Sequence, residues 1–182
     1  MAYYNQGISG GNGAQPFDDS ANFPDPDPQG RRLSIVRVRS ANSIDSIQFV
    51  YLAASGYEMP APHHGGQGGN EGEFDIGDGE HLIALEGSFG NYVDFIRLIT
   101  DKGRKKEFGT YHALVPWGTA YAVSSEEPLP GVGNYFGYHA PPGYEIFAIW
   151  GNSAHLLDAI GVVYRPISKN VGMEKIRHSP SP

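Results

Sequence analysis

Two stretches of this chain share one pattern, and together they decide its fold class. Residues 41–51 read ANSIDSIQFVY and residues 154–164 read AHLLDAIGVVY, so each has a small residue, an Asp four positions later, an Ile and a final Val-Tyr. A shorter copy, GNYVDFI, spans residues 90–96. Each copy indicates a tight turn followed by a strand. Three copies predict three similar β-subunits around a pseudo-threefold axis, and the Asp spacings of 49 and 64 residues are too uneven for an open solenoid.

A second element also recurs in the chain. Residues 10–14 read GGNGA with Phe-Asp soon after, and residues 65–69 read GGQGG, again with Phe-Asp a few residues later. A weaker copy, GVGN, occupies residues 131–134. Glycine lets the backbone approach a ligand or a neighbouring strand without interference from a Cβ atom.

Short β-type runs, separated by Gly, Pro, Asn and Asp, fill most of the remaining chain, and helical periodicity is nearly absent. The shift of the apolar pattern within residues 33–39 predicts a bulge there. The basic run at 102–106 is typical of a solvated hairpin tip, and residues 124–143 are expected to form a long surface loop. Strands are expected at residues 3–8, 33–39, 44–51, 81–86, 93–100, 105–108, 113–116, 120–123, 145–150 and 156–164.

Composition limits the classes of protein that fit. The chain has 182 residues and no Cys, which suits one domain, expected at residues 1–166, followed by a poorly ordered polar tail at 167–182. A net charge of −7 argues against a nucleic-acid partner, and no apolar run approaches the length of a membrane span. The start of the chain lacks the pattern of a secretory signal, so we expect a cytoplasmic protein, with release by a non-classical route left open.

The repeated Asp, at the mouth of a strand, has two interpretations. Its carboxylate beside outward-pointing backbone N–H groups offers the mixture of acceptors and donors that a polyol needs, because each hydroxyl both donates and accepts. Alternatively, the Asp caps its own turn through the backbone. The three copies, two of them with a matching Gly-rich loop, favour the first interpretation.

In this order the motifs resemble the jacalin-related lectins. The matching stretches are GGNG at 10–13, FDD at 17–19, IDSIQFVY at 44–51, HGG at 64–66, GEHLIALEG at 79–87 and LDAIG at 157–161. The resemblance implies an all-β fold, a β-prism of three four-stranded Greek-key sheets. It also implies reversible, metal-free binding of glycans. Strand material precedes the Gly-rich loop in the uncut chain, which resembles the mannose/glucose-preferring branch of the family. Neither catalysis nor a cofactor is implied.

The resemblance also implies which residues bind sugar. In a main site, Ala14, His155 and Leu156 would lend backbone N–H groups and Asp158 its carboxylate. A second site would use Asn42, Ser43, Asp45, Gly68 and Gly69. A third would use Asn91, Tyr92 and Asp94, with the 131–134 loop as its partner.

Two residues depart from the family pattern. Ala14 stands where the family often has Gly, and Ala154 stands at the first position of the turn. If either position needs a positive φ, alanine costs about 1 kcal/mol or changes the turn. This departure is the best support for an alternative function, a β-prism protein–protein module whose sugar sites have lapsed.

Other motifs are weaker signals. Residues 7–11 match Gly-x-Ser-x-Gly, but the helix that a nucleophile elbow requires does not follow. His63-His64 has no partner at a metal-ligand spacing, so no metal is expected. The adjacent acidic pairs at 18–19 and 126–127 point apart on extended backbone and form no glycosidase dyad. Trp117 and Trp150 are interpreted as core or interface residues.

Weak single sites need multivalency, so a homo-oligomer binding mannose-type glycans or glycoproteins is expected, with residues 135–138 as one candidate interface.

Overall fold

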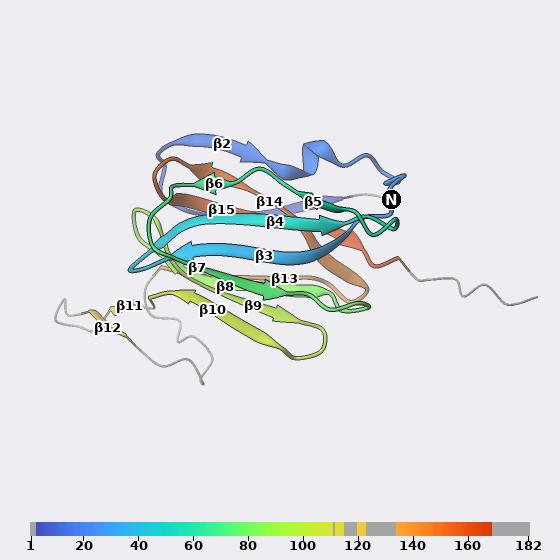
Figure 1. Cartoon of the computed structure of the whole chain (residues 1–182). Coiled ribbons are helices and arrows are strands. Elements are labelled where there is room, and N and C mark those ends of the chain that lie inside the picture. Colours follow the sequence, from blue (N-terminus) through green and yellow to red (C-terminus); the bar gives the residue numbers. More distant parts are fainter. Residues whose placement is uncertain (1–2, 111, 115–119, 123–133, 169–182) are drawn as a thin grey trace, which may run out of the picture.

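The computed structural model describes residues 3–110, 112–114, 120–122 and 134–168, and its strands form three large antiparallel sheets and one two-stranded ribbon (Figure 1). The first sheet has the order β1 (Tyr4–Gly10), β15 (Leu157–Pro166), β14 (Tyr144–Ser153), β2 (Gln15–Asp18). The second has β5 (Glu58–Pro60), β4 (Ile44–Leu52), β3 (Arg32–Ser40), β7 (Asn70–Asp75), with β6 (His64–Gly65) also on β4. The third has β10 (Lys105–Gly109), β9 (Val93–Thr100), β8 (Leu82–Phe89), β13 (Tyr135–His139).

Each sheet is built on the same plan. A long central hairpin (β14–β15, β3–β4 or β8–β9) is flanked by one outer strand on each side. In the first and second sheets a Gly-rich loop joins the outer strands and crosses the end of the hairpin. In the second sheet β5 and β6 share one outer position, because both pair with β4. This is the predicted β-prism of three Greek-key sheets. Two small elements complete the described chain: a 3-10 turn, η1 (Asp19–Asn22), and a ribbon of β11 (His112–Leu114) with β12 (Ala120–Ala122).

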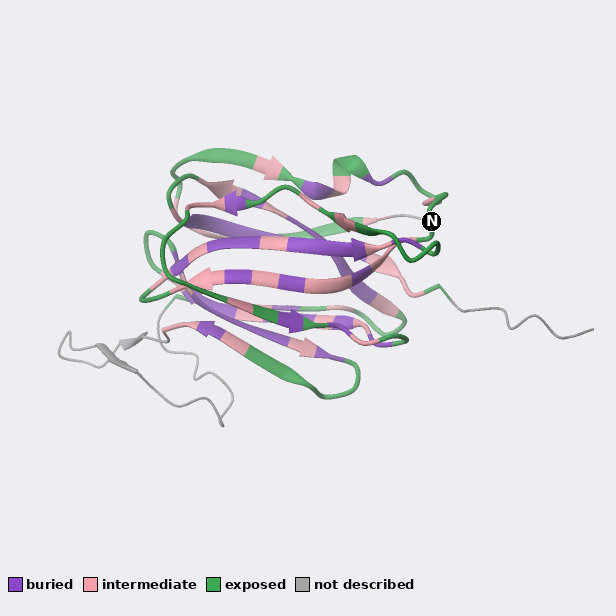
Figure 2. Ribbon diagram, viewed as in Figure 1, coloured by how far each residue is buried: buried purple, intermediate pink, exposed green. Residues whose placement is uncertain are grey.

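The apolar residues of the central hairpins face inward and form one core between the sheets. Figure 2 shows this burial along β3, β4 and β15. The Tyr51 hydroxyl, fully inside the core, donates to the Phe147 carbonyl at 2.7 Å and so satisfies its polar group there. The largest fully buried side chains are Tyr51, Tyr164, Phe49, Phe147, Ile44, Ile47, Leu82, Leu85, Ile96, Leu98, Ile146 and Ile149.

The three repeated turns lie at the same end of the prism, on the left in Figure 1. They join β3 to β4, β8 to β9, and β14 to β15. The Gly-rich loops that join β1 to β2 and β6 to β7 reach the same end. The fold therefore brings the repeated sequence elements together at one pole, which we call the turn pole.

Most expected strands are present, and the predicted bulge occurs as a register shift between Leu33 and Ile35. The basic run forms the β9–β10 hairpin tip, as predicted. The loop expected at 124–143 is wrong in part, because β13 lies within it and pairs with β8. Phe136 and Tyr138 drive this pairing by burying their rings in the core, a tertiary effect that the Gly- and Pro-rich composition conceals.

Several expectations fall outside the described residues, among them Trp117, residues 126–127 and most of the expected polar tail. Within the described part of the chain, no helix is long and apolar enough to cross a bilayer.

Candidate functional site

The first Gly-rich loop lies directly on the start of β15. The Gly11 N–H donates to the Asp158 carbonyl oxygen at 2.9 Å, and within the turn the Ala154 N–H donates to the Leu156 carbonyl at 3.1 Å. Gly10 has a φ of 140°, and a Cβ atom there would clash with the Asp158 carbonyl. Glycine is therefore required where loop and strand meet. We call this loop and turn site 1; it holds every residue predicted for the main site.

The Asp158 carboxylate is the most informative group in site 1. The residue is only 6% exposed, and its Oδ2 atom is buried without a hydrogen-bond partner. Gly13 lies against it, since a Cβ on Gly13 would stand 3.1 Å from Oδ1. A buried carboxylate without partners is unfavourable, because it has lost its hydration and gained nothing in return. It is therefore poised to accept hydrogen bonds from a ligand, whereas a turn cap would already be bonded to the backbone.

Donors lie beside this acceptor. Within the described residues, the backbone N–H groups of His155 and Leu156 make no backbone hydrogen bond. His155 is exposed and Leu156 is half-buried. Site 1 thus combines a charged acceptor with unpaired main-chain donors, the combination that the sequence predicted for polyol binding.

The two alanine departures differ in their consequences. Ala14 has a φ of 73° and is the one described non-glycine residue with a positive φ. The left-handed conformation costs an L-residue roughly 1–2 kcal/mol. Ala154 carries no such strain. Strain of this kind is typical of binding loops held in shape by the surrounding structure.

The second Gly-rich loop reproduces site 1 on the second sheet. The Gly66 N–H donates to the Asp45 carbonyl at 2.9 Å, and Gly65 has a φ of 118°. Gly68 and Gly69 lie so close to the Asp45 carboxylate that a Cβ at either position would clash with it. Within the described residues that carboxylate has no hydrogen-bond partner. The structure thus brings Asp45 together with both predicted glycines; we call this arrangement site 2.

Two further residues were predicted for this second site. Asn42 is exposed in the same turn. Ser43 is directed elsewhere, since its hydroxyl donates to Asp94 Oδ1 at 3.0 Å.

The third turn has a different surrounding. Asn91 and Tyr92 are exposed at its tip, while Asp94 accepts the hydrogen bond from Ser43. Gly109, the last residue of β10, lies beside Asp94 and has a φ of 82°. The next residue, Thr110, donates its N–H to the Asp94 carbonyl at 3.1 Å. Gly109 was not predicted from the sequence, because no second glycine follows it.

The 131–134 stretch was predicted as the partner of the third turn. It belongs to the connection between β10 and β13, the counterpart of the two Gly-rich loops. Of these residues the structure describes only Asn134, whose carbonyl accepts from the Phe89 N–H at 2.9 Å. The rest of the prediction lies outside the described residues.

Each loop also contacts a turn of a different sheet. Gly11 packs on the Asn91 carbonyl, and Gly66 packs on the His155 carbonyl. In the third such contact, the Thr110 hydroxyl donates to the Ala41 carbonyl at 3.1 Å. The three sites therefore form one cyclic arrangement at the turn pole, as expected from pseudo-threefold symmetry.

His64, considered above as a metal ligand, is instead paired within the fold. Its Nε2 atom lies 2.7 Å from Asp19 Oδ1, and its ring stacks on Phe17 with 3.7 Å between ring centroids. The described residues contain no group of three or more His, Cys, Asp or Glu side chains suited to a metal ion. Through Phe17 and Asp19 these two contacts join β2 and η1, which follow the first Gly-rich loop, to β6, which precedes the second.

The enzymatic motifs are also used structurally. Ser9 lies in β1, and its hydroxyl is 2.5 Å from the Tyr138 hydroxyl, with β2 rather than a helix following. Asp18 accepts from Ser20, while Asp19 pairs with His64, so the two carboxylates face different partners. Neither arrangement places a nucleophile or an acid–base pair in a cleft.

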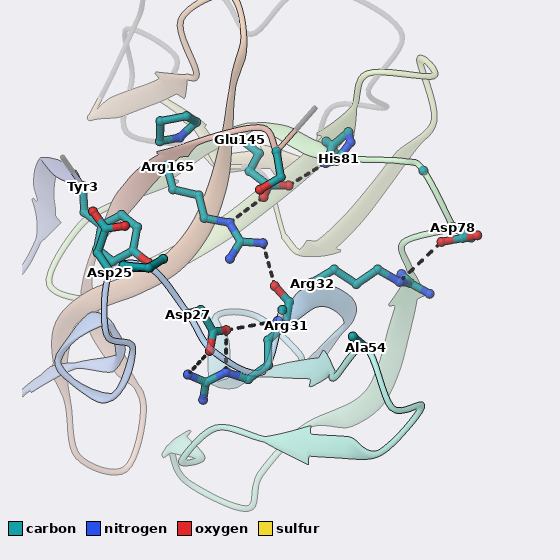
Figure 3. A pocket seen from close by; sticks show the side chains of 15 residues that line it. Tyr3, Asp25, Asp27, Arg31, Arg32, Ala54, Asp78, His81, Glu145 and Arg165 are labelled. Carbon is teal, nitrogen blue, oxygen red and sulfur yellow. Dashed lines mark hydrogen bonds and ion pairs between the residues drawn. The ribbon is translucent and has the colours of Figure 1, made fainter. Parts of the chain in front are cut away.

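A pocket of about 690 Å³ opens at the pole opposite the turns (Figure 3). Its charged groups are paired with each other: Glu145 lies 2.6 Å from His81 and 2.7 Å from Arg165, and Arg165 also donates to the Arg31 carbonyl at 2.8 Å. Arg31 in turn forms an ion pair with Asp27. The network ties the three sheets together at this pole, and we assign it a structural role.

This network predicts a pH-dependent stability. The hydrogen bond to Glu145 raises the pKa of His81 above its usual 6.5. Burial raises the pKa of Glu145, but the hydrogen bond from His81 and the charge of Arg165 outweigh it and lower the pKa below its usual 4.5. The His81 contribution is thus complete below about pH 6.5 and is lost as pH rises through the folded-state pKa; the Glu145 contribution is present above about pH 4.5 and is lost at more acid pH.

We expect His81→Gln to destabilise the protein more at pH 5.5 than at pH 8.5, because only the protonated imidazole gains from Glu145. Urea unfolding of both proteins at the two pH values measures this difference. An equal loss of stability at both values would contradict it.

Comparison with known proteins agrees with the fold. The family model for the jacalin-like lectin domain matches residues 6–163. Malaysian banana lectin superposes with a TM-score of 0.67 at 23% identity, covering 91% of this chain and 100% of that one. A mannose-binding jacalin-related lectin from Ananas comosus gives a TM-score of 0.64 at 25% identity, with 91% and 99% covered. Artocarpin, in a complex with mannotriose, gives 0.65 at 19% identity, with the same coverage.

Family membership indicates a carbohydrate-binding protein rather than an enzyme. Since the family model covers most of the chain and the fold is the β-prism of the structural neighbours, this protein belongs to the jacalin-like lectin family.

Proposed function

We propose that the protein binds mannose- and glucose-type glycans reversibly, mainly through site 1. The observation that carries this proposal is the Asp158 carboxylate, which is buried and lacks a partner at Oδ2 beside unpaired backbone N–H groups. In the proposed complex Asp158 accepts from two neighbouring sugar hydroxyls. The N–H groups of Ala14, His155 and Leu156 donate to the sugar oxygens.

Site 2 is proposed as a further sugar site, because Asp45 and its glycines repeat the arrangement of site 1. We rank the third turn lower, since Asp94 already accepts the Ser43 hydroxyl. One monosaccharide in such a shallow site binds with a Kd of roughly 1 mM, about −4 kcal/mol. Two sites on one prism, and a homo-oligomer of prisms, would raise the avidity for branched glycans by roughly 10²–10⁴.

Titration of the ¹⁵N-labelled protein with methyl α-mannoside tests the proposal. We expect the amide resonances of Ala14, His155 and Leu156 to shift first and those of Asn42 and Gly69 next. Methyl α-glucoside should act on the same amides, and methyl α-galactoside serves as the control that leaves them in place. If neither mannoside, glucoside nor branched oligomannose moves these resonances, the protein–protein module is the better interpretation.

A further inference from the structure

A shallow groove of about 550 Å³ runs along the outer face of the first sheet. Its walls come from β1, β2 and β14, the strands that lead into the Gly-rich loop and the turn of site 1. Asn152, in this groove, is two residues from Ala154, roughly 7 Å along the strand. The groove therefore lies next to site 1 in the fold. It is lined by Ile8, Pro16, Phe17, Asp18, Trp150, Gly151 and Asn152.

Trp150 is held as a flat aromatic surface in this groove. A Cβ on Gly161 would clash with the indole, so the absence of a side chain there lets the ring lie across β15. The indole N–H donates to the Gln6 carbonyl at 3.3 Å, which further restrains the ring. Trp150 is half-buried: it packs against the core and is also partly exposed in the groove. A restrained aromatic ring offers contact area at little entropic cost.

Polar and apolar groups accompany the ring. Asn152 lies two residues from Trp150 and thus projects from the same face of β14. Within the described residues its side-chain amide has no hydrogen-bond partner. On the other side of the groove, Ile8 is 43% exposed, a high value for a large apolar side chain in a strand.

We propose that this groove binds the sugar next to the one held in site 1. A pyranose ring has an apolar face of C–H groups and an edge of hydroxyls. Trp150 and Ile8 would contact the face, while the Asn152 amide would donate to and accept from the edge. The inference rests on the proposed function of site 1 and gives it a substrate class, oligosaccharides with at least two linked rings.

Isothermal titration with mannose and with mannotriose tests the groove. The wild type should bind mannotriose more tightly than mannose. Trp150→Ala should weaken mannotriose binding roughly tenfold and leave mannose binding unchanged, because the lost contact lies beyond site 1. Asn152→Ala should have the same effect with a smaller loss, and Trp150→Phe, which keeps an aromatic ring, should retain most of the gain for mannotriose.

The outcomes separate the two proposals. A wild type that binds neither sugar would overturn both. A wild type that binds the two equally per site, or variants that keep the full preference for mannotriose, would overturn the groove alone. A change of oligomeric state in Trp150→Ala without loss of mannotriose affinity would assign this face to contact between copies of the chain, and the groove proposal would also be wrong.

Discussion

Replacing Asp158 with alanine is expected to lower the affinity of site 1 for mannose by at least about a hundredfold, so that binding there becomes undetectable. Each charge-assisted hydrogen bond contributes about 1.5–3 kcal/mol, and the proposed complex loses two of them. The amide shifts of His155 and Leu156 during a mannoside titration measure this loss. Those of Asn42 and Gly69 should still move, because site 2 has its own carboxylate, Asp45.

Asp158→Asn is the matched variant for this experiment, because it keeps the shape and removes the charge. Because Oδ2 has no partner, removing the charge of the carboxylate should cost the folded protein little stability. We therefore expect Asp158→Asn to bind mannose at least tenfold more weakly and to unfold at the same or a higher urea concentration than the wild type. A turn-capping Asp would behave oppositely. Strong destabilisation with intact mannose binding would contradict the role proposed for Asp158.

Replacing Gly109 with alanine is expected to cost about 3 kcal/mol of unfolding free energy. Its φ of 82° disfavours any L-residue, and its Cβ would also clash with the Asp94 carbonyl and stand 2.9 Å from Ile44 Cδ1. The left-handed conformation costs roughly 1–2 kcal/mol, and overpacking against a backbone that cannot move adds roughly 1–3 kcal/mol.

Gly143→Ala is the control for this variant. Gly143 has the same φ of 82°, but a Cβ there would meet nothing within 4 Å. It should therefore cost only the roughly 1–2 kcal/mol of the left-handed conformation. Urea unfolding of the two variants compares them directly. Equal losses of unfolding free energy would contradict this prediction, because the contact of a Cβ at Gly109 with the Asp94 carbonyl would then add no cost.

The architecture could be predicted from local sequence patterns. Repeated turn-and-strand motifs predicted three similar sheets, and the short β-type runs predicted the strands that form the central hairpins. The missed strands β2, β5, β6, β7 and β13 are mostly short outer strands. Their residues are weak β-formers or follow Gly and Pro, and they become strands because a hairpin edge offers them hydrogen bonds.

For the site, the family resemblance carried by the motifs implied which residues are brought together: Asp158 with the 10–14 loop, and Asp45 with Gly68 and Gly69. The residues around each Asp determined by themselves only the turn and the strand mouth, because these are local features. Only the tertiary structure decided that Asp158 is buried without a partner at Oδ2, that Asp94 is bonded to Ser43, and that Ala14 carries strain. Hydrogen-bond satisfaction depends on residues distant in the chain, and the conformation of the loop depends on the strand beneath it, so neither is a property of the local sequence.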